Sequence, residues 1–138
     1  SKPAPLKNKK QNFSQNSRTN KFKPRKLFGI LYDVENNSTH FEHMIEQMSH
    51  KDDLFIFNDN IDDMNTTKKG GGNAVIRPYS GGKYPRAIGI PTGNFDGMDS
   101  GKIHDVIEGA LQKLRHLLLE RDRYKRIYWS VDDRGELG

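Results

Sequence analysis

The stretch Leu54-Phe55-Ile56-Phe57-Asn58-Asp59-Asn60 decides the fold of this chain. Its four consecutive apolar residues are typical of a strand buried on both faces, as at the centre of a parallel sheet. The polar triplet ends that strand, and a polar loop then leads to Lys68-Lys69-Gly70-Gly71-Gly72-Asn73. Long polar loops in compact domains are often functional. We therefore expect a central strand followed by a glycine-rich loop that handles phosphate groups.

Three further strands are predicted around this central one, at residues 27–34, 87–91 and 126–131. Each is rich in apolar residues and is followed by turn-forming residues. Residues 73–76 begin either a helix or a strand, which Pro78 is expected to stop soon afterwards.

Two helices are predicted between the strands. The first begins with a capping box formed by Thr39 and Glu42 and is expected to end near His50, with Phe41, Met44, Ile45 and Met48 on its apolar face. The second begins near Ser100 and carries an apolar stripe made of Ile103, Val106, Ile107, Ala110, Leu111, Leu114, Leu117 and Leu118. This alternation of strands and helices predicts an α/β fold whose strands are mostly parallel.

The first 26 residues differ from the rest in charge. They hold nine Lys/Arg and no acidic residue, whereas the other 112 residues carry a net charge of −4. A segment with so few large apolar residues does not bury enough surface to offset its ordering entropy. We therefore expect a basic, flexible arm at residues 1–26 and one α/β domain at residues 27–138.

The arm has two open interpretations. It either neutralises phosphates on RNA, on DNA or on an acidic partner, or it is a solvated leader or linker. The residues that would contact a nucleic acid are Lys7, Lys9, Lys10, Arg18, Lys21, Lys23, Arg25 and Lys26.

Composition disfavours several classes of protein. The chain has no cysteine, which excludes disulfides and thiolate metal sites. It has no apolar run near the ~18 residues of a membrane helix and no apolar stretch typical of a signal peptide. We therefore expect no membrane partner and a cytoplasmic or other intracellular location. No cofactor is expected, and no metal site either, because none of the five histidines has ligand spacing backed by other ligands: His40, His43, His50, His104 and His116.

Three loops that follow predicted strands carry glycine together with Asn or Asp, at residues 58–73, 92–99 and 132–138. In parallel sheets the carboxyl ends of the strands share one edge, and ligands bind outside that edge. Glycine lets a backbone approach a phosphate closely, and asparagine side chains can hydrogen-bond a ribose or a base. Each loop also has a simpler interpretation as ordinary turn chemistry. Neither the P-loop spacing nor the dinucleotide-binding fingerprint is present.

The run D-L-F-I-F-N-D-N, a loop and then G-G-G-N-A-V-I resembles the macro-domain pattern. The segments R-A-I-G-I-P-T-G and I-Y-W-S-V-D-D-R-G-E-L-G are similar to the later strands and the second phosphate loop of that family. The resemblance is closer to small macro-like proteins of viral or bacterial origin and covers about residues 52–138. It implies a three-layer sandwich around a mostly parallel mixed sheet, with a carboxyl end that is truncated here.

The resemblance also implies a ligand, ADP-ribose or a related nucleotide. Asn60 would face the distal ribose, residues 70–73 would cradle the diphosphate, and residues 135–138 would close over it. The implied ligand-binding set is Asn58, Asn60, Gly70, Gly71, Gly72, Asn73, Thr92, Gly93, Asp132, Gly135 and Gly138.

Hydrolysis of an ADP-ribose linkage needs an activated water, and in some macro domains the phosphate of the substrate assists. Catalytic residues are therefore not assigned, and binding and hydrolysis stay open. Two alternatives from other classes remain: a nucleic-acid-binding protein that uses the arm, with the domain as a scaffold, and a structural or assembly protein that retains the fold without a ligand.

Overall fold

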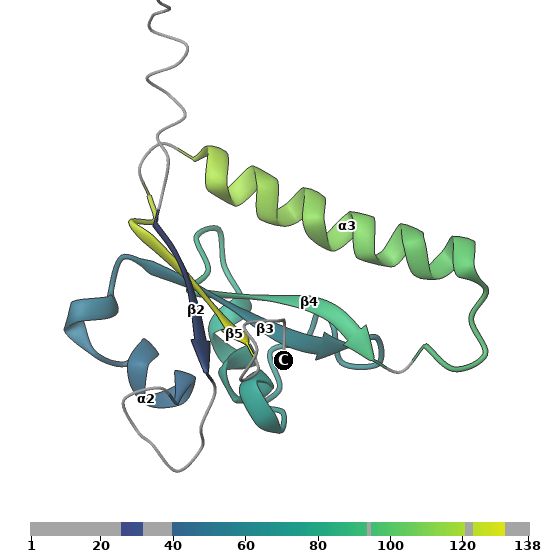
Figure 1. Ribbon diagram of the computed structural model, residues 1–138, viewed down its shortest axis with the longest axis horizontal. Coiled ribbons are helices and arrows are strands. Elements are labelled where there is room, and N and C mark those ends of the chain that lie inside the picture. The colour runs from purple at the N-terminus through teal and green to yellow at the C-terminus, as the bar shows by residue number, and fades with distance from the viewer. Residues whose placement is uncertain (1–25, 32–39, 94, 121–122, 132–138) are drawn as a thin grey trace, which may run out of the picture.

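The fold is an α/β arrangement around one parallel sheet. The computed structural model describes residues 26–31, 40–93, 95–120 and 123–131. Four strands lie in the order β2 (Lys26–Leu31), β5 (Arg126–Val131), β3 (Asp53–Asn60) and β4 (Ala87–Gly93), as Figure 1 shows. Every described pairing is parallel. The α/β class and the four predicted strands are confirmed, although residues 32–34 of the first predicted strand lie outside the described residues. β4 runs to Gly93, and β3 extends further than predicted because the polar triplet continues the strand.

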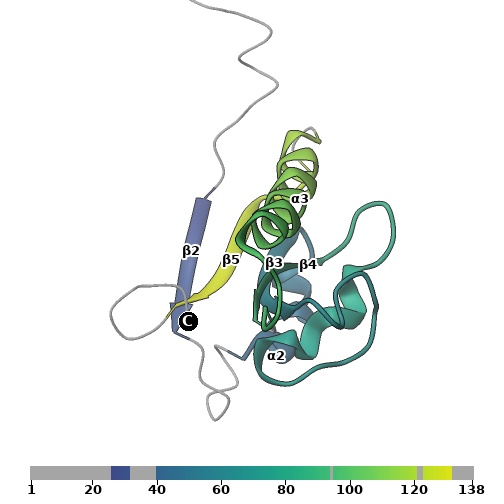
Figure 2. The same ribbon diagram turned by 90° about the vertical axis from the view of Figure 1, so that its right-hand side faces the viewer.

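Helices pack on both faces of the sheet. Side chains alternate along β3, so Phe55 and Phe57 face one side while Leu54 and Ile56 face the other. The first side packs against α2 (Phe41–Ile45) and the 3₁₀ helix η2 (Gly72–Ser80). The second side packs against α3 (Ser100–Leu119), which is seen nearly end-on in Figure 2. The described part of the chain is therefore layered as helix, sheet and helix.

The first helix is shorter than predicted. Its N-cap is His40, whose Nδ1 accepts a hydrogen bond from the Glu42 amide at 3.2 Å, while Thr39 lies outside the described residues. The helix ends at Ile45 because Gln47 is extended, and a separate 3₁₀ turn η1 (Met48–His50) follows. This change of direction leaves Met48 77% exposed, so its predicted place on the apolar face is wrong.

Pro78 does not stop the segment that begins at Asn73. The 3₁₀ helix η2 includes Pro78 and continues to Ser80. Two hydrogen bonds hold its last turn: Ser80 Oγ donates to Arg77 O within the helix, and the Arg86 amide donates to Tyr79 O from the segment that follows it.

The long helix α3 is confirmed and begins after Asp99, whose carboxylate accepts from the Lys102 amide at 2.8 Å. The predicted stripe is only partly buried. Ala110 and Leu117 are covered, whereas Leu111 is 42% exposed. Within the part of the chain that the structure describes, no helix has the length and apolar character needed to cross a membrane.

Candidate ligand site at the carboxyl edge of the sheet

The connections that follow β3 and β4 leave toward opposite faces of the sheet. After β3 the chain turns to η2 on one face of the sheet, and after β4 it turns to α3 on the other. Adjacent parallel strands whose connections leave in opposite directions form a crevice at their carboxyl ends, where α/β proteins bind ligands. Asn60 pairs with Gly93 in this region, so the first two predicted glycine loops meet there.

Asn73 holds the glycine loop against the sheet. The ladder between β3 and β5 ends at the pair Ile56 and Trp129. Just beyond it, Asn73 Oδ1 accepts from the Asn58 amide at 2.9 Å, and Asn73 Nδ2 donates to Ser130 Oγ at 2.8 Å. The buried carboxamide of Asn73 thus replaces a missing backbone pair and joins η2 to both strands. Ser130 was not predicted; its only signal in the sequence is a small polar residue within an apolar strand.

A buried ion pair packs against the inner side of the same loop. Arg77 donates from Nη2 to Asp59 Oδ1 at 2.7 Å and from Nε to the same oxygen at 3.2 Å. Its Nη1 donates to Lys68 O at 2.9 Å. The two side chains are 2% and 5% exposed, so the pair is inside the protein. Neither Asp59 nor Arg77 was among the predicted site residues. The sequence does not show that the side chain of Arg77, on the 3₁₀ helix η2, points into the protein.

The three glycines of the loop differ in what a side chain at each position would meet. A Cβ on Gly70 would lie 2.7 Å from Arg77 Nη1, so Gly70 is required by the ion pair beneath it. Gly72 has a φ of +56°, which L side chains rarely adopt. Gly71 has an ordinary φ of −88°, is exposed, and a Cβ there would meet nothing within 4 Å. Packing and backbone conformation therefore do not account for the glycine at Gly71.

Asn60 shapes the turn that follows β3. Its Oδ1 accepts from the Asp63 amide at 2.9 Å, and its Nδ2 donates to Asp63 Oδ2 at 3.1 Å. These bonds form an Asx-type turn that fixes the start of the polar loop. The structure thus places Asn60 at the predicted edge, with its carboxamide engaged within the chain.

Lys69 is engaged in a surface ion pair. Its Nζ lies 2.8 Å from Glu42 Oε2 of α2. The hydrogen bond from Lys69 lowers the pKa of the Glu42 carboxyl, and the same bond raises the pKa of the lysine. This contact ties the glycine loop to α2, and its exposure makes it a weak source of stability.

The remaining predicted residues divide into two groups. Thr92 is exposed at the end of β4, and Gly93 accepts from the Ile61 amide at 3.4 Å, so both lie at the carboxyl edge. Asp132, Gly135 and Gly138 lie outside the described residues, as do the arm positions from Lys7 to Arg25. Lys26 is the first residue of β2.

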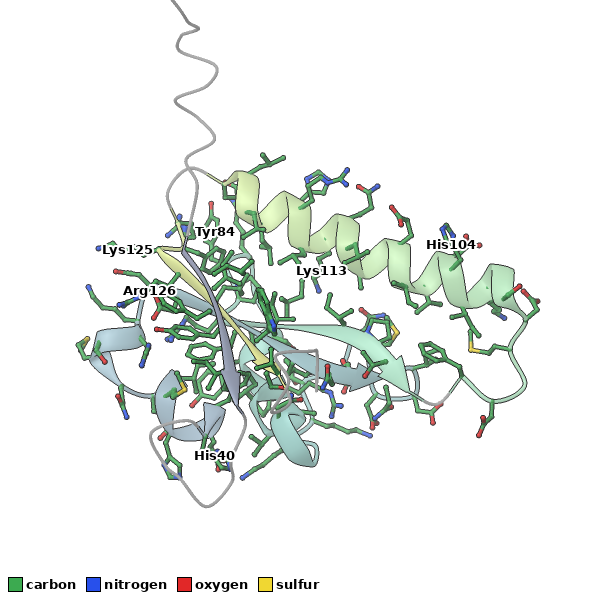
Figure 3. The ribbon with its side chains drawn as sticks, in the orientation of Figure 1. His40, Tyr84, His104, Lys113, Lys125 and Arg126 are labelled. Atoms are coloured by element: carbon green, nitrogen blue, oxygen red, sulfur yellow. The ribbon has the colours of Figure 1, made fainter. Side chains whose placement is uncertain are left out.

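Another charged cluster closes the opposite, amino edge of the sheet. The buried carboxylate of Asp53 lies 2.9 Å from Arg126 Nε and 2.8 Å from His50 Nδ1. The hydrogen bond to Asp53 raises the pKa of Arg126, which is labelled in Figure 3. Arg86 donates from Nε to Asp53 O and from Nη2 to His50 O. All of these groups satisfy one another, which identifies the cluster as structural.

The carboxyl edge offers backbone groups more than acid–base groups, since the carboxamides of Asn60 and Asn73 are engaged within the chain. Its carboxylates Asp59 and Asp63 bond to Arg77 and Asn60, respectively. Among the described residues no group of three or more potential ligands is arranged to hold a metal ion. No family model, no curated protein and no solved structure matches the chain.

Proposed function

We propose that the carboxyl edge of the sheet binds ADP-ribose or a related nucleotide in the manner of a macro-like domain. The observation that carries this proposal is Gly71, an exposed glycine that neither packing nor φ requires, in a loop that Asn73 fastens to β3 and β5. A glycine whose side-chain position is empty leaves room for a ligand phosphate to approach the backbone closely.

The proposal assigns a role to each part of the edge. The backbone at Gly71 and Gly72 contacts the diphosphate, and Thr92 and Gly93 form the facing wall on β4. Asn60 acts through the turn that it holds with Asp63. The layered parallel sheet agrees with the macro-like resemblance of residues 52–138, and this agreement supports the family proposal at the level of fold class.

Binding is the activity that the described edge supports. The carboxylates Asp59 and Asp63 at this edge bond to Arg77 and Asn60, so neither is assigned as a general base for a water. Any hydrolysis of an ADP-ribose linkage would then depend on the phosphate of the substrate to activate the water.

Calorimetric titration with ADP-ribose tests the proposal. We expect saturable binding by the wild-type chain and a loss of at least about tenfold in affinity for Gly71→Val, because the new side chain occupies the space of the phosphate. The fold should be unaffected, since a Cβ at Gly71 meets nothing within 4 Å and its φ suits a β-branched residue. Gly101→Ala, at an exposed position in the first turn of α3, is the matched control and should bind like wild type. Absence of heat from the wild type at millimolar ligand, or full binding by Gly71→Val, would contradict the proposal.

A second candidate function belongs to the arm at residues 1–26. Nine basic residues without an acidic one favour electrostatic binding of RNA or DNA. This function is independent of the edge and can coexist with nucleotide binding.

A further inference from the structure

A cleft lies beside the outer side of β4, next to the segment 64–67 that precedes the glycine loop. It has a volume of about 520 Å³, within the range of small-molecule sites. The segments 64–67 and 80–82 form one wall, and α3 forms the other with Val106, Ala110 and Lys113. Lys113 extends from α3 toward the sheet, as Figure 3 shows. Phe57 and Ile88 supply apolar surface near the strands.

Within the described residues, one oxygen of a buried carboxylate at this cleft has no hydrogen-bond donor. All hydrogen bonds to the Asp59 side chain go to Oδ1, which accepts from the Asn60 amide and from two nitrogens of Arg77. Among the residues that the structure describes, no group donates to Oδ2. The side chain is only 5% exposed and lines the cleft. A buried acceptor without a donor is unfavourable, so Oδ2 is a place where a ligand gains a strong hydrogen bond.

The strand beside this oxygen presents backbone groups to the same space. The Phe55 amide donates to Arg86 O, which fixes the alternation of the parallel ladder between β3 and β4. By that alternation Ile88 directs its backbone groups toward β3, and Gly89 directs its N–H and C=O outward. Within the described sheet β4 is one of the two edge strands, and Gly89 lines the cleft.

Gly89 is also what allows the carboxylate to reach this position. A Cβ on Gly89 would lie 2.5 Å from Asp59 Oδ2 and 2.9 Å from Phe57 Cε2. The absence of a side chain therefore brings an acceptor, Oδ2, next to a backbone donor, the Gly89 N–H. Together they form a donor–acceptor pair on the lining of a cleft that holds both apolar side chains and polar ones such as Thr66 and Lys113.

We propose that this cleft is a separate binding site for a small molecule that carries a planar amide, either a primary carboxamide or a lactam, on an apolar body. The N–H of the amide donates to Asp59 Oδ2, and its C=O accepts from the Gly89 N–H. The apolar body packs against Ile88 and Val106, on the side of the cleft that faces α3.

A neutral ligand suits the charges around the cleft. The two carboxylates that line it are matched by two cations, since Asp59 is paired with Arg77 and the cleft lining includes both Asp105 and Lys113. A further charge would be unbalanced in this partly buried space, whereas a neutral amide satisfies Oδ2 without adding one.

Titration with benzamide, followed by the amide NMR signals of Gly89 and Gly109, tests this proposal. Roughly millimolar affinity is expected for a probe of this size. Methyl benzoate has the same body without an N–H donor, and benzoate carries a charge, so both should bind at least about tenfold more weakly. Equal binding of the three probes, or no saturable shift with benzamide, would overturn the proposal.

Two variants on α3 show where the probe binds. Gly109 lines the cleft and a Cβ there meets nothing within 4 Å, so Gly109→Leu should fill the cleft, retain the helix and weaken benzamide at least about tenfold. Gln112→Leu, at an exposed position of the same helix outside the cleft, should leave benzamide binding unchanged. Equal benzamide affinity in Gly109→Leu and wild type would overturn the proposed location.

The two sites can be tested separately. Gly71→Val should retain benzamide binding, and Gly109→Leu should retain ADP-ribose binding. Displacement of benzamide by ADP-ribose would overturn the claim that the cleft is a separate site, while a failure of ADP-ribose alone to bind would leave benzamide binding intact.

Discussion

Loss of Arg77 should destabilise the domain by several kilocalories per mole. The guanidinium is 2% exposed and makes two bonds to Asp59 Oδ1 and one to Lys68 O. Arg77→Met keeps the apolar stem beside Phe57 but leaves the buried carboxylate without its partner. Removing one member of a buried pair typically costs about 3–5 kcal/mol. For a domain whose total stability is about 5–15 kcal/mol, this is a large fraction.

The assay is urea unfolding monitored through Trp129, the single tryptophan of the chain, which lies on β5. Arg77→Met should lose about 4 kcal/mol, and Arg77→Lys should lose less because it keeps the charge while losing the paired geometry. Asp59→Asn tests the other partner. The double variant Asp59→Asn with Arg77→Met should lose less than the sum of the single variants, by about 2 kcal/mol or more, because it leaves no unpaired charge.

Two results would refute this reasoning. A cost below about 1 kcal/mol for Arg77→Met would show that the guanidinium is solvated in solution. Additivity of the single variants within about 0.5 kcal/mol would show that the two side chains do not interact.

Three other predictions concern the cleft, the tyrosines and the arm. Gly89→Ala should lower the free energy of unfolding in urea by about 1–3 kcal/mol, because its methyl would lie 2.5 Å from a carboxylate oxygen. Gly109→Ala should be neutral or stabilising. Equal effects of the two variants would contradict the packing described at β4. Burial raises the pKa of the Tyr124 and Tyr128 hydroxyls above the usual value of about 10. The neutral hydroxyls therefore stabilise the fold below about pH 10, and the free energy of unfolding should fall as the pH rises through the folded-state pKa values. Urea midpoints that stay flat up to about pH 11 would count against this. Deletion of residues 1–25 should abolish a salt-dependent affinity for RNA or DNA, measured as the slope of log K against log salt, and an unchanged slope would exclude the arm as the binding element.

The strands could be predicted from the sequence because burial on both faces leaves a direct signature. Residues 126–131 match β5 in both bounds, and the helix that begins at Ser100 was equally clear from its apolar period. The polar triplet after Phe57 was read as the end of β3, although it continues the strand to Asn60. Polar residues can extend a strand where a partner satisfies them, and Arg77 provides that partner for Asp59.

The support of the site could not be predicted, because it depends on tertiary contacts. Asn73 was predicted to touch a ligand, but its carboxamide bonds to Asn58 and Ser130 inside the protein. Lys69 stands next to the glycines as a phosphate-binding lysine would, yet α2 supplies Glu42 as its partner. Neither pairing has a local sequence signature, since each joins segments from different elements. The place of the glycine loop was therefore predictable, while the reason for each polar residue around it was not.

The central claim is that the carboxyl edge of the sheet is the nucleotide site, and amide NMR shifts on titration with ADP-ribose test it most directly. The account predicts that the largest shifts fall on Gly71, Gly72 and Gly93, with little change at Gly89 and Gly109 beside the separate cleft. Saturating ADP-ribose that leaves the edge signals unmoved, or that shifts mainly Gly89 and Gly109, would contradict it.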